Sequence, residues 1–379
     1  MAKVVPIEQQ YNQLPRPTFR WMEVNFQAVE PLSYNDDPAL RPDERHEGDV
    51  TVEFYRGNRI PEINDFTGAN PQSLAPTMAD TSNGIAITVP DGKAGKVWLD
   101  FTINEVAPQY VGQIYIKAGK DSKLDVYMSY NGGSIHGLVN VFDYLEVGDN
   151  ATVSLNKVQV NGEDTNHIEH RYAKAGTDST VNYYSAELGS KKTVVYYKND
   201  LDHDRSTFNS QAMYIGDDDQ VFDFSYWVPT SGVKTNTDIL TTGALLGKSK
   251  KYFRGTIDFL RGGKKAVGNE SDVCLLLSPK VHSISLPLLL CKEDDVVGNH
   301  ASSAGQIDKD KLFYLMSRGF NEEGAQLIIV ESNIRPVIDK LGDTILINKA
   351  LQAVRAKMDF CETEGECSDK CAKRFPNLN

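Results

Sequence analysis

The chain has 379 residues, of which 40% are hydrophobic and 24% are charged, and 40 Lys and Arg against 52 Asp and Glu give a net charge of −12. This balance is typical of a soluble globular protein and excludes both a disordered chain and a membrane-embedded one. The acidic excess also argues against a nucleic-acid partner, because affinity for nucleic acid depends on clustered Lys and Arg side chains.

The apolar runs and the cysteines indicate where in the cell the protein is located. Residues 1–17 contain no continuous apolar stretch, so we expect no secretory signal. The most apolar run, residues 284–291, contains Ser285 and Pro287 and is far shorter than the roughly 20 residues that a spanning helix needs. Five cysteines, an odd number, are typical of reduced thiols. The sequence therefore predicts a cytoplasmic protein with no membrane contact.

The first two segments of the chain differ in composition and in predicted secondary structure. Residues 1–80 are punctuated by prolines, and we expect them to form an irregular N-terminal arm. Residues 81–305 consist of short β-branched and aromatic runs separated by Gly, Asn and Asp, as in residues 97–103 and 221–226, which is the pattern of strands. So long a β body must close or stack its edges as a sandwich, a propeller or a β-helix. The sequence has no clean repeat, and periodicity favours a β-helix only modestly over a sandwich.

The third segment, residues 306–379, is expected to be a helical C-terminal region. Asp308 is a candidate N-cap for a first helix, and Gly319 stands where a left-handed C-terminal residue belongs. Asn321 would open a second helix, which Pro336 would kink or restart. Asp343 would cap a third helix with an apolar stripe.

The residues of this chain do not have the spacing that familiar catalytic motifs require. Residues 243–249 resemble a phosphate loop, but three residues separate the glycines where four are needed. His167 and His170 would face opposite sides of a strand, which argues against a shared ligand role. The spacing of these residues thus indicates no familiar catalytic site.

The cysteines are candidate metal ligands. Cys361, Cys367 and Cys371 lie close together near the C-terminus, and thiolates are soft ligands that suit zinc or iron. Their spacing lacks a Cys-x-x-Cys pair, so a metal or persulfide role and dispensable tail thiols both stay open. Cys274 and Cys291 lie in apolar strand runs and would by default be small buried residues.

A series of motifs between residues 275 and 319 is more specific. The chain has Leu275-Leu-Leu-Ser-Pro-Lys280, then His300-Ala-Ser-Ser, Gly305-Gln-Ile-Asp308 and Leu312-Phe-Tyr-Leu-Met-Ser-Arg-Gly319. In this order they closely resemble the SufB/SufD family of iron-sulfur cluster assembly proteins. The resemblance covers roughly the last half of the chain.

This resemblance implies a right-handed parallel β-helix flanked by helices. Family members pair through their β-helices, with a SufB-type paralogue or a second copy, and carry a SufC-type ATPase on their C-terminal helical region. They form a scaffold on which iron-sulfur clusters are built transiently from iron and desulfurase-derived sulfur. The chain itself would not hydrolyse ATP.

The resemblance also assigns roles to single residues. His300 falls on the family histidine assigned to cluster assembly at the subunit interface, where a neutral imidazole is able to ligate iron. Ala301 stands where the SufB branch has glutamate, which indicates a SufD-like subunit, with Cys291 or the tail thiols as substitute ligands. Phe313, Tyr314 and Arg318 would lie at the ATPase docking surface or simply pack the helical region.

A carbohydrate-binding or carbohydrate-active β-helix is the alternative. It would use exposed aromatic side chains such as Tyr183 and Tyr184. A glycosidase also needs a pair of carboxylates across a groove, which the sequence does not indicate.

Overall fold

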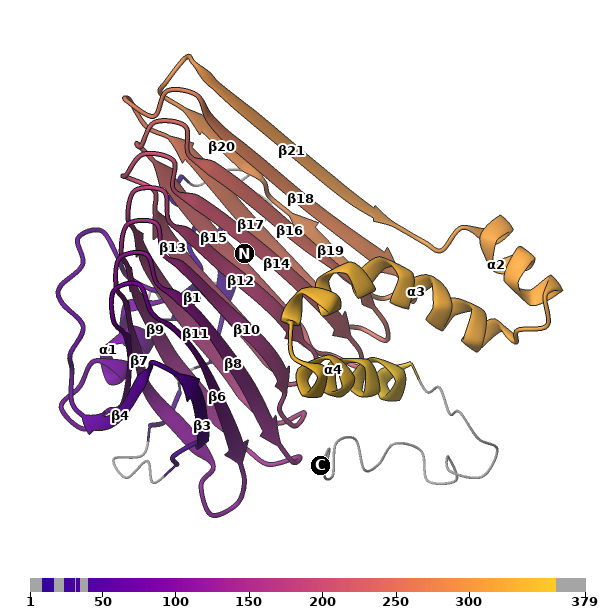
Figure 1. Cartoon of the computed structure of the whole chain (residues 1–379). Helices are drawn as coiled ribbons and strands as arrows, with labels where there is room; N and C mark the ends of the chain where they lie inside the picture. The colour runs from indigo at the N-terminus through magenta and orange to yellow at the C-terminus, as the bar shows by residue number, and fades with distance from the viewer. Residues whose placement is uncertain (1–8, 17–23, 31, 35–39, 359–379) are drawn as a thin grey trace, which may run out of the picture.

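A parallel β-solenoid forms the body of the protein (Figure 1). The computed structural model describes residues 9–16, 24–30, 32–34 and 40–358. Nearly every rung of the solenoid contributes one strand to each of two sheets, which have nine and ten strands. The expected mainly β chain, with a parallel β-helix and a C-terminal helical region, is confirmed.

The strands follow one another in the order of the sequence. The nine-stranded sheet contains, from one end, β21 (Val296–Gly305), β18 (Ala266–Leu276), β16 (Asn236–Leu245), β14 (Thr207–Gly216), β12 (Thr180–Glu187), β10 (Thr152–Val160), β8 (Lys123–Gly132), β6 (Ala94–Ile103) and β3 (Asp43–Gly48). The ten-stranded sheet contains β19 (His282–Ser285), β17 (Lys250–Phe259), β15 (Val221–Thr230), β13 (Lys192–Asp200), β11 (Asn166–Ala175), β9 (Leu138–Val147), β7 (Gln109–Ala118), β5 (Asn83–Val89) and β4 (Thr51–Arg56), with β20 (Leu288–Cys291) also paired to β17.

The turns between the sheets supply the regularity of the stack. Asp121, Asn150 and Asp178 occupy equivalent turns on successive rungs, with left-handed φ angles of 56°, 56° and 57°. Asn and Asp tolerate this backbone region better than other residues that carry a Cβ atom. The Asn150 side chain also donates a hydrogen bond of 2.7 Å to Asp121 Oδ1 on the rung before it. Each turn therefore restarts the chain at a fixed place on the next rung.

Apolar and aromatic side chains fill the space between the two sheets. Aromatic rings stack along the axis, as for Tyr197 and Tyr226, whose centroids lie 3.9 Å apart, and for Phe101 and Tyr130 at 4.6 Å. The interior also encloses charged groups, and several of them are paired: the Lys157 ammonium contacts Glu187 Oε1 at 2.7 Å and also contacts Glu169. Pairing offsets the desolvation that burying such groups costs.

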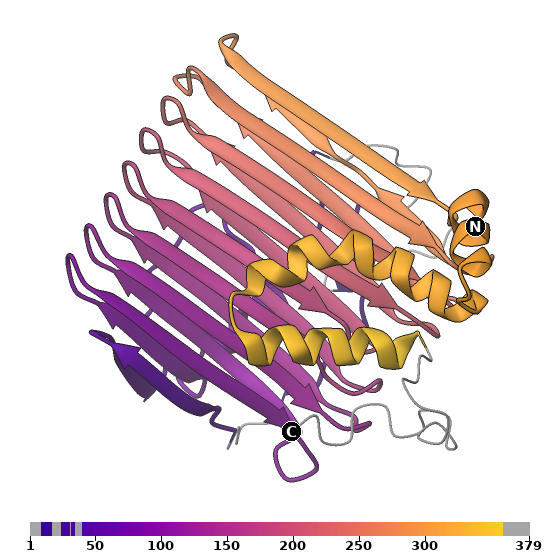
Figure 2. The ribbon, with the colours of Figure 1, turned by 45° about the vertical axis from the view of Figure 1, so that its right-hand side comes forward.

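The C-terminal helices are α2 (Lys309–Ser317), α3 (Glu322–Ile338), the short 3₁₀ helix η3 (Asp339–Leu341) and α4 (Thr344–Lys357). The three expected N-caps are confirmed: Asp308, Asn321 and Asp343 each accept a backbone hydrogen bond at their helix start. Two of these helices, α3 and α4, lie across the outer face of the nine-stranded sheet, where their apolar sides bury residues of β10, β12, β14 and β16 (Figures 1 and 2).

The N-terminal arm covers the outer face of the ten-stranded sheet. It includes β1 (Gln10–Tyr11), β2 (Gln27–Ala28) and α1 (Pro71–Thr77), and its apolar side chains pack on those of β9, β11 and β13. Strands β3 and β4 pair antiparallel with β6 and β5 and close the N-terminal end of the stack. None of the helices within the described residues combines the length and apolar character needed to span a membrane.

Candidate functional site

The C-terminal end of the solenoid is open. Strand β21 is hydrogen-bonded along its length to β18, and among the described residues no strand pairs with its other edge. Its side chains from Val297 to Ala304 are exposed and most of them are small. An edge of this length presents a row of backbone N–H and C=O groups that another chain can pair with.

His300 lies in the middle of this open strand, above a column of inward-facing polar residues. The register aligns His300 with Glu270 of β18, Ser302 with Asp272, and Ala304 with Cys274. Aligned residues of parallel strands point to the same face, about 4.8 Å apart. Since Glu270, Asp272 and Cys274 are buried between the sheets whereas His300 is exposed, His300 stands where this column meets solvent.

Glu270 is the unusual member of the column. Its side chain is 1% exposed, and neither carboxylate oxygen has a hydrogen-bond partner among the described residues. Burial raises the pKa of Glu270 well above its usual range, and the neighbouring Asp272 raises it further. Gly255 makes room for this side chain, because a Cβ at that position would lie 1.5 Å from Glu270 Oε1. Glu270 is therefore a buried carboxyl group just beneath His300, in surroundings that favour its protonated form.

The other two members of the column, Asp272 and Cys274, are less suited to bind a metal ion. The Lys251 ammonium forms a buried ion pair with Asp272, so these two charges neutralise each other. Burial raises the pKa of the Cys274 thiol, which keeps it in the protonated form that binds metals poorly. The expected burial of Cys274 is confirmed.

Cys291 departs from the prediction. It is exposed, and the expectation of a small buried residue is wrong for it. The reason is its position: it ends β20 on the last rung, and none of the described residues forms a further rung over it. Cys291 and His300 thus share the terminal rung but lie on different sheets.

The candidate metal ligands are not brought into one cluster. Within the described residues, no three His, Cys, Asp or Glu side chains are arranged to hold a metal ion. Cys361, Cys367 and Cys371 lie outside the described residues. His167 faces the interior beside Glu169, whereas His170 faces the arm, which agrees with the opposite orientations expected for them.

The helix α2 carries the candidate docking residues. None of its residues is buried, and the exposed fraction is 74% for Phe313 and 56% for Tyr314. The Arg318 guanidinium lies 5.0 Å from the centroid of the Tyr314 ring. Of the two interpretations left open, packing within the helical region is not what the structure shows for Phe313 and Tyr314, because α2 projects from the body beyond β21 (Figures 1 and 2). They form an exposed aromatic patch.

Glu270 and Gly255 were missed by the sequence analysis. Glu270, Asp272 and Cys274 occupy every second position of β18, so their side chains lie on one face of the strand. Polar residues on a face that is expected to be apolar are a signal in the sequence that points to this site. Tyr183 was expected to be exposed and is 2% exposed, which is a further correction: its ring packs between the sheets against Tyr197.

A β-solenoid with an open end and a projecting aromatic helix defines the class of protein. The family model described as "SUF system FeS cluster assembly, SufBD core domain" matches residues 101–333, more than half of the chain. The chain therefore belongs to this family and is a SufD-like member of it. This membership and the burial of Tyr183 remove the support for a carbohydrate-binding β-helix.

Several curated relatives are similar to this chain. It is 28% identical over 203 residues to the iron-sulfur cluster assembly protein SufD of Bacillus subtilis, covering 53% of this chain and 46% of that protein. It is 23% identical over 343 residues to SufD of Escherichia coli, covering 82% of this chain and 79% of that protein. An iron-sulfur cluster assembly SufBD family protein of Pyrococcus horikoshii is 35% identical over 94 residues, which is 25% of this chain and 21% of that protein. The match thus spans less than half of the B. subtilis protein.

Proposed function

We propose that this chain is a non-catalytic scaffold subunit of a cytoplasmic SUF complex, on which iron-sulfur clusters are assembled transiently. The observation that carries the proposal is the position of His300, exposed on an unpaired edge strand and above a buried carboxylic acid. A second chain placed against β21 would enclose His300 between two subunits. The occupants would be iron and sulfide, the latter supplied through a cysteine desulfurase system.

The open edge supports pairing with a second family member. Edge strands are usually shortened, charged or covered, because an exposed long edge invites pairing. Strand β21 has ten residues, none of them Lys, Arg, Asp or Glu. A SufB-type paralogue, or a second copy of this chain, would extend the nine-stranded sheet through it.

The chemistry of His300 and Glu270 suits iron as a substrate. A neutral imidazole is a good ligand for iron, and a carboxylate is a hard oxygen donor. Burial favours the protonated form of Glu270, and iron bound above it would compete with that proton. Cys291 and the tail thiols Cys361, Cys367 and Cys371 would supply the softer thiolate ligands, and the partner subunit would complete the set.

ATP hydrolysis would belong to a SufC-type partner bound at α2. Residues 243–249 run from β16 through a turn into β17, so a strand follows the glycines where a phosphate loop needs a helix. Phe313 and Tyr314 form an exposed apolar patch of the kind that marks an interaction site, with Arg318 at its rim.

The test compares two variants of neighbouring residues on β21. His300→Ala removes the imidazole, whereas Asn299→Ala alters a side chain on the opposite face, which contacts Asn269. In complexes reconstituted anaerobically with the partner subunits, we expect iron and sulfide loading to fall about ten-fold for His300→Ala, a loss typical of an impaired metal site. Asn299→Ala should load as the parent does.

Both variants should retain the thermal stability of the parent, because both side chains lie on an exposed strand. Undiminished loading of His300→Ala would remove His300 from the site. Equal losses in both variants would point to a damaged interface instead.

A further inference from the structure

A lysine-rich pocket lies along the ten-stranded sheet and reaches β19 on the last rung. The pocket has a volume of about 430 Å³. It is lined by Lys191, Lys192, Lys248, Lys250, Lys280, His282, Val221 and Asp219. Five ammonium groups against one carboxylate are an unusual concentration in a chain whose net charge is −12. We call these eight residues the lysine pocket.

The register of the solenoid creates this concentration. Lys192, Val221, Lys250 and His282 are aligned on the consecutive strands β13, β15, β17 and β19, at steps of about 4.8 Å. The remaining lysines lie in or beside the turns that lead into the same strands. Like charges held this close destabilise the folded chain unless an anion offsets them.

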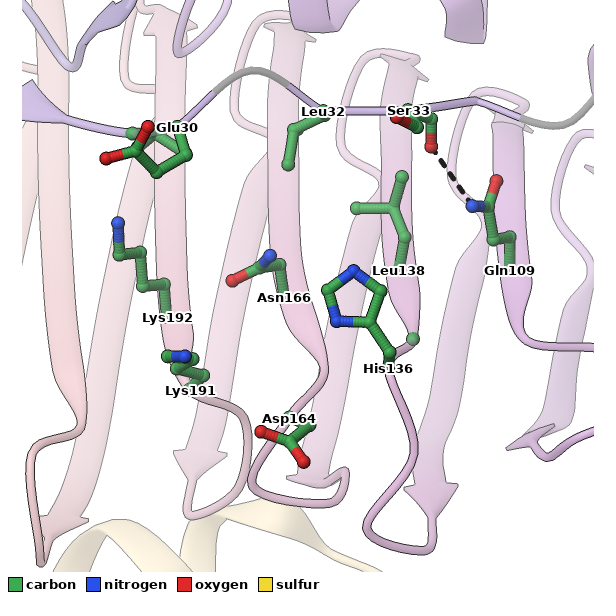
Figure 3. A pocket seen from close by; sticks show the side chains of 12 residues that line it. Glu30, Leu32, Ser33, Gln109, His136, Leu138, Asp164, Asn166, Lys191 and Lys192 are labelled. Atoms are coloured by element: carbon green, nitrogen blue, oxygen red, sulfur yellow. Dashed lines mark hydrogen bonds between the residues drawn. The ribbon is translucent and has the colours of Figure 1, made fainter.

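At one end of the pocket the arm already supplies such an anion. Figure 3 shows Glu30, Leu32 and Ser33 crossing the starts of the strands, with Glu30 opposite Lys192. Burial lowers the pKa of Lys192, and the Glu30 charge counteracts this. Within the described residues, Lys191, Lys248, Lys250, Lys280 and His282 form no ion pair. One lysine is therefore compensated by a carboxylate from a crossing segment, and the others are not.

The chemistry of the lining selects carboxylates over phosphates. The backbone N–H groups of Val221, Lys250 and His282 all donate to carbonyl groups of the preceding rung, so no amide cradle is free for a phosphate. The lining contains no Phe, Tyr, Trp or Arg on which a nucleobase would stack. What remains is a row of separated ammonium groups, which fits carboxylates spaced along an extended peptide.

The chain delivers such a peptide to this place. Lys357, in the last turn of α4, donates hydrogen bonds to Asp217 Oδ1 at 2.6 Å and to Gln220 Oε1. These residues belong to the turn that contains Asp219, and the Gln220 side chain donates to Ser190 O at 2.7 Å, next to Lys191. The end of α4 is thus fastened to the wall of the lysine pocket.

The residues that follow α4 have a matching charge pattern. Glu362, Glu364 and Glu366 alternate with Thr363 and Gly365. In an extended chain, alternate side chains lie on one side, about 6.6 Å apart. Glu362 follows Lys357 by five residues, a reach of at most about 17 Å. So short a tether gives the glutamates a high effective concentration at the pocket.

We propose that residues 362–366 dock in the lysine pocket of their own chain, with the three glutamates facing its ammonium groups. This interaction is independent of the proposed scaffold function, and it is electrostatic, so salt weakens it.

Carbodiimide cross-linking of the full chain tests the proposal, because it joins Lys and Glu side chains that are in contact. At low salt we expect cross-links from Lys248, Lys250 or Lys280 to the glutamates of residues 362–366, and loss of most of their yield at high salt. The triple variant K248E/K250E/K280E should lose these cross-links. Adding E362K/E364K/E366K to it should restore them with the charges exchanged.

The matched control is K96E/K120E/K123E, which reverses three exposed lysines elsewhere on the body and should keep the parent cross-links. Circular dichroism and thermal melting establish that each variant is folded. A mixture of ¹⁵N-labelled and unlabelled chains should give no mixed-isotope cross-links. Absence of the cross-links at low salt, or a majority of mixed-isotope ones, would overturn docking within one chain.

Discussion

His170 is held neutral between the ten-stranded sheet and the N-terminal arm. Its Nδ1 accepts a hydrogen bond of 2.9 Å from the Ala69 N–H, and its Nε2 lies 3.2 Å from Asn140 Oδ1. Burial lowers the pKa of His170 to about 3. The unfolded chain binds this proton near pH 6.5, so between the two values the unfolded state holds more protons than the folded one. The stability of the folded state therefore decreases as the pH falls below 6.5.

We expect His170→Gln to flatten this pH dependence. Glutamine retains a polar side chain but does not titrate. Between pH 7 and pH 5, the free energy of unfolding of the parent should fall by about 2 kcal/mol more than that of the variant. Urea unfolding at a series of pH values measures the difference. Parallel profiles for the two proteins would show that another group is responsible.

At the level of single residues, sequence motifs located His300 but not its surroundings. The motif gives its position, whereas Glu270 becomes its neighbour only through a register of 30 residues between β18 and β21. The exposure of Cys291 likewise depends on which rung is the last one, and local apolar character does not reveal that. Contacts between rungs join residues that are far apart in the sequence, so they become known only when the strands are stacked.

Among the C-terminal helices, α2 is the one with no buried residue. We expect Phe313→Glu to weaken binding of a SufC-type ATPase by about 2 kcal/mol, or roughly thirty-fold, the size of a central interface residue. The control is Ile345→Glu on α4, since Ile345 is 65% exposed and lies on another helix. Titration calorimetry with the ATPase measures both. Equal weakening by the two changes would argue against α2 as the docking surface.

Strand β21 is the second element with a free face. Ala301→Lys and Ser303→Lys together would place charges on its exposed edge region, and edge lysines discourage strand pairing. We expect this double variant to lose association with the proposed SufBD-family partner in analytical ultracentrifugation. Thr51→Lys, on β4 at the opposite end of the stack, should associate normally. Unchanged association of the double variant would place the subunit interface elsewhere.

The C-terminal helices were predictable because their signals are local. The capping residues and their backbone donors lie within three positions of each other. The expected effect of Pro336 is smaller than a kink in mid-helix: it occupies the last turn of α3, which ends at Ile338 and passes into η3. A proline so close to the end breaks little of the hydrogen-bond ladder.

At the scale of the whole molecule, a solenoid contacts itself only between adjacent rungs, so its stability is unevenly distributed. The central rungs are covered by α3 and α4 on one sheet and by the arm on the other, whereas β19, β20 and β21 are not. We expect amide hydrogen exchange to be fastest in β19 to β21 and slowest in β9 to β13. Mass spectrometry of the isolated chain measures this, and uniform protection along the stack would contradict it.

The β body was predictable, but its architecture was not predictable from periodicity alone. The regular feature is a left-handed turn residue that recurs at Asp121, Asn150, Asp178, Arg205, Lys234 and Lys265. Only the first three are residue types that favour this conformation, so the later turns leave no compositional trace. The choice of a β-helix over a sandwich depended on the family resemblance instead.

The two ends of the stack differ, and this difference would limit the size of an assembly formed through β21. Strand β3 at the N-terminal end runs antiparallel to the stack and has the sequence Asp43-Glu-Arg-His-Glu-Gly48, so its mixed charges oppose the addition of another strand. Two copies that join by their β21 edges would expose only their protected ends. Polymerisation then stops at a defined stoichiometry, and a fold otherwise suited to fibre growth yields a closed particle.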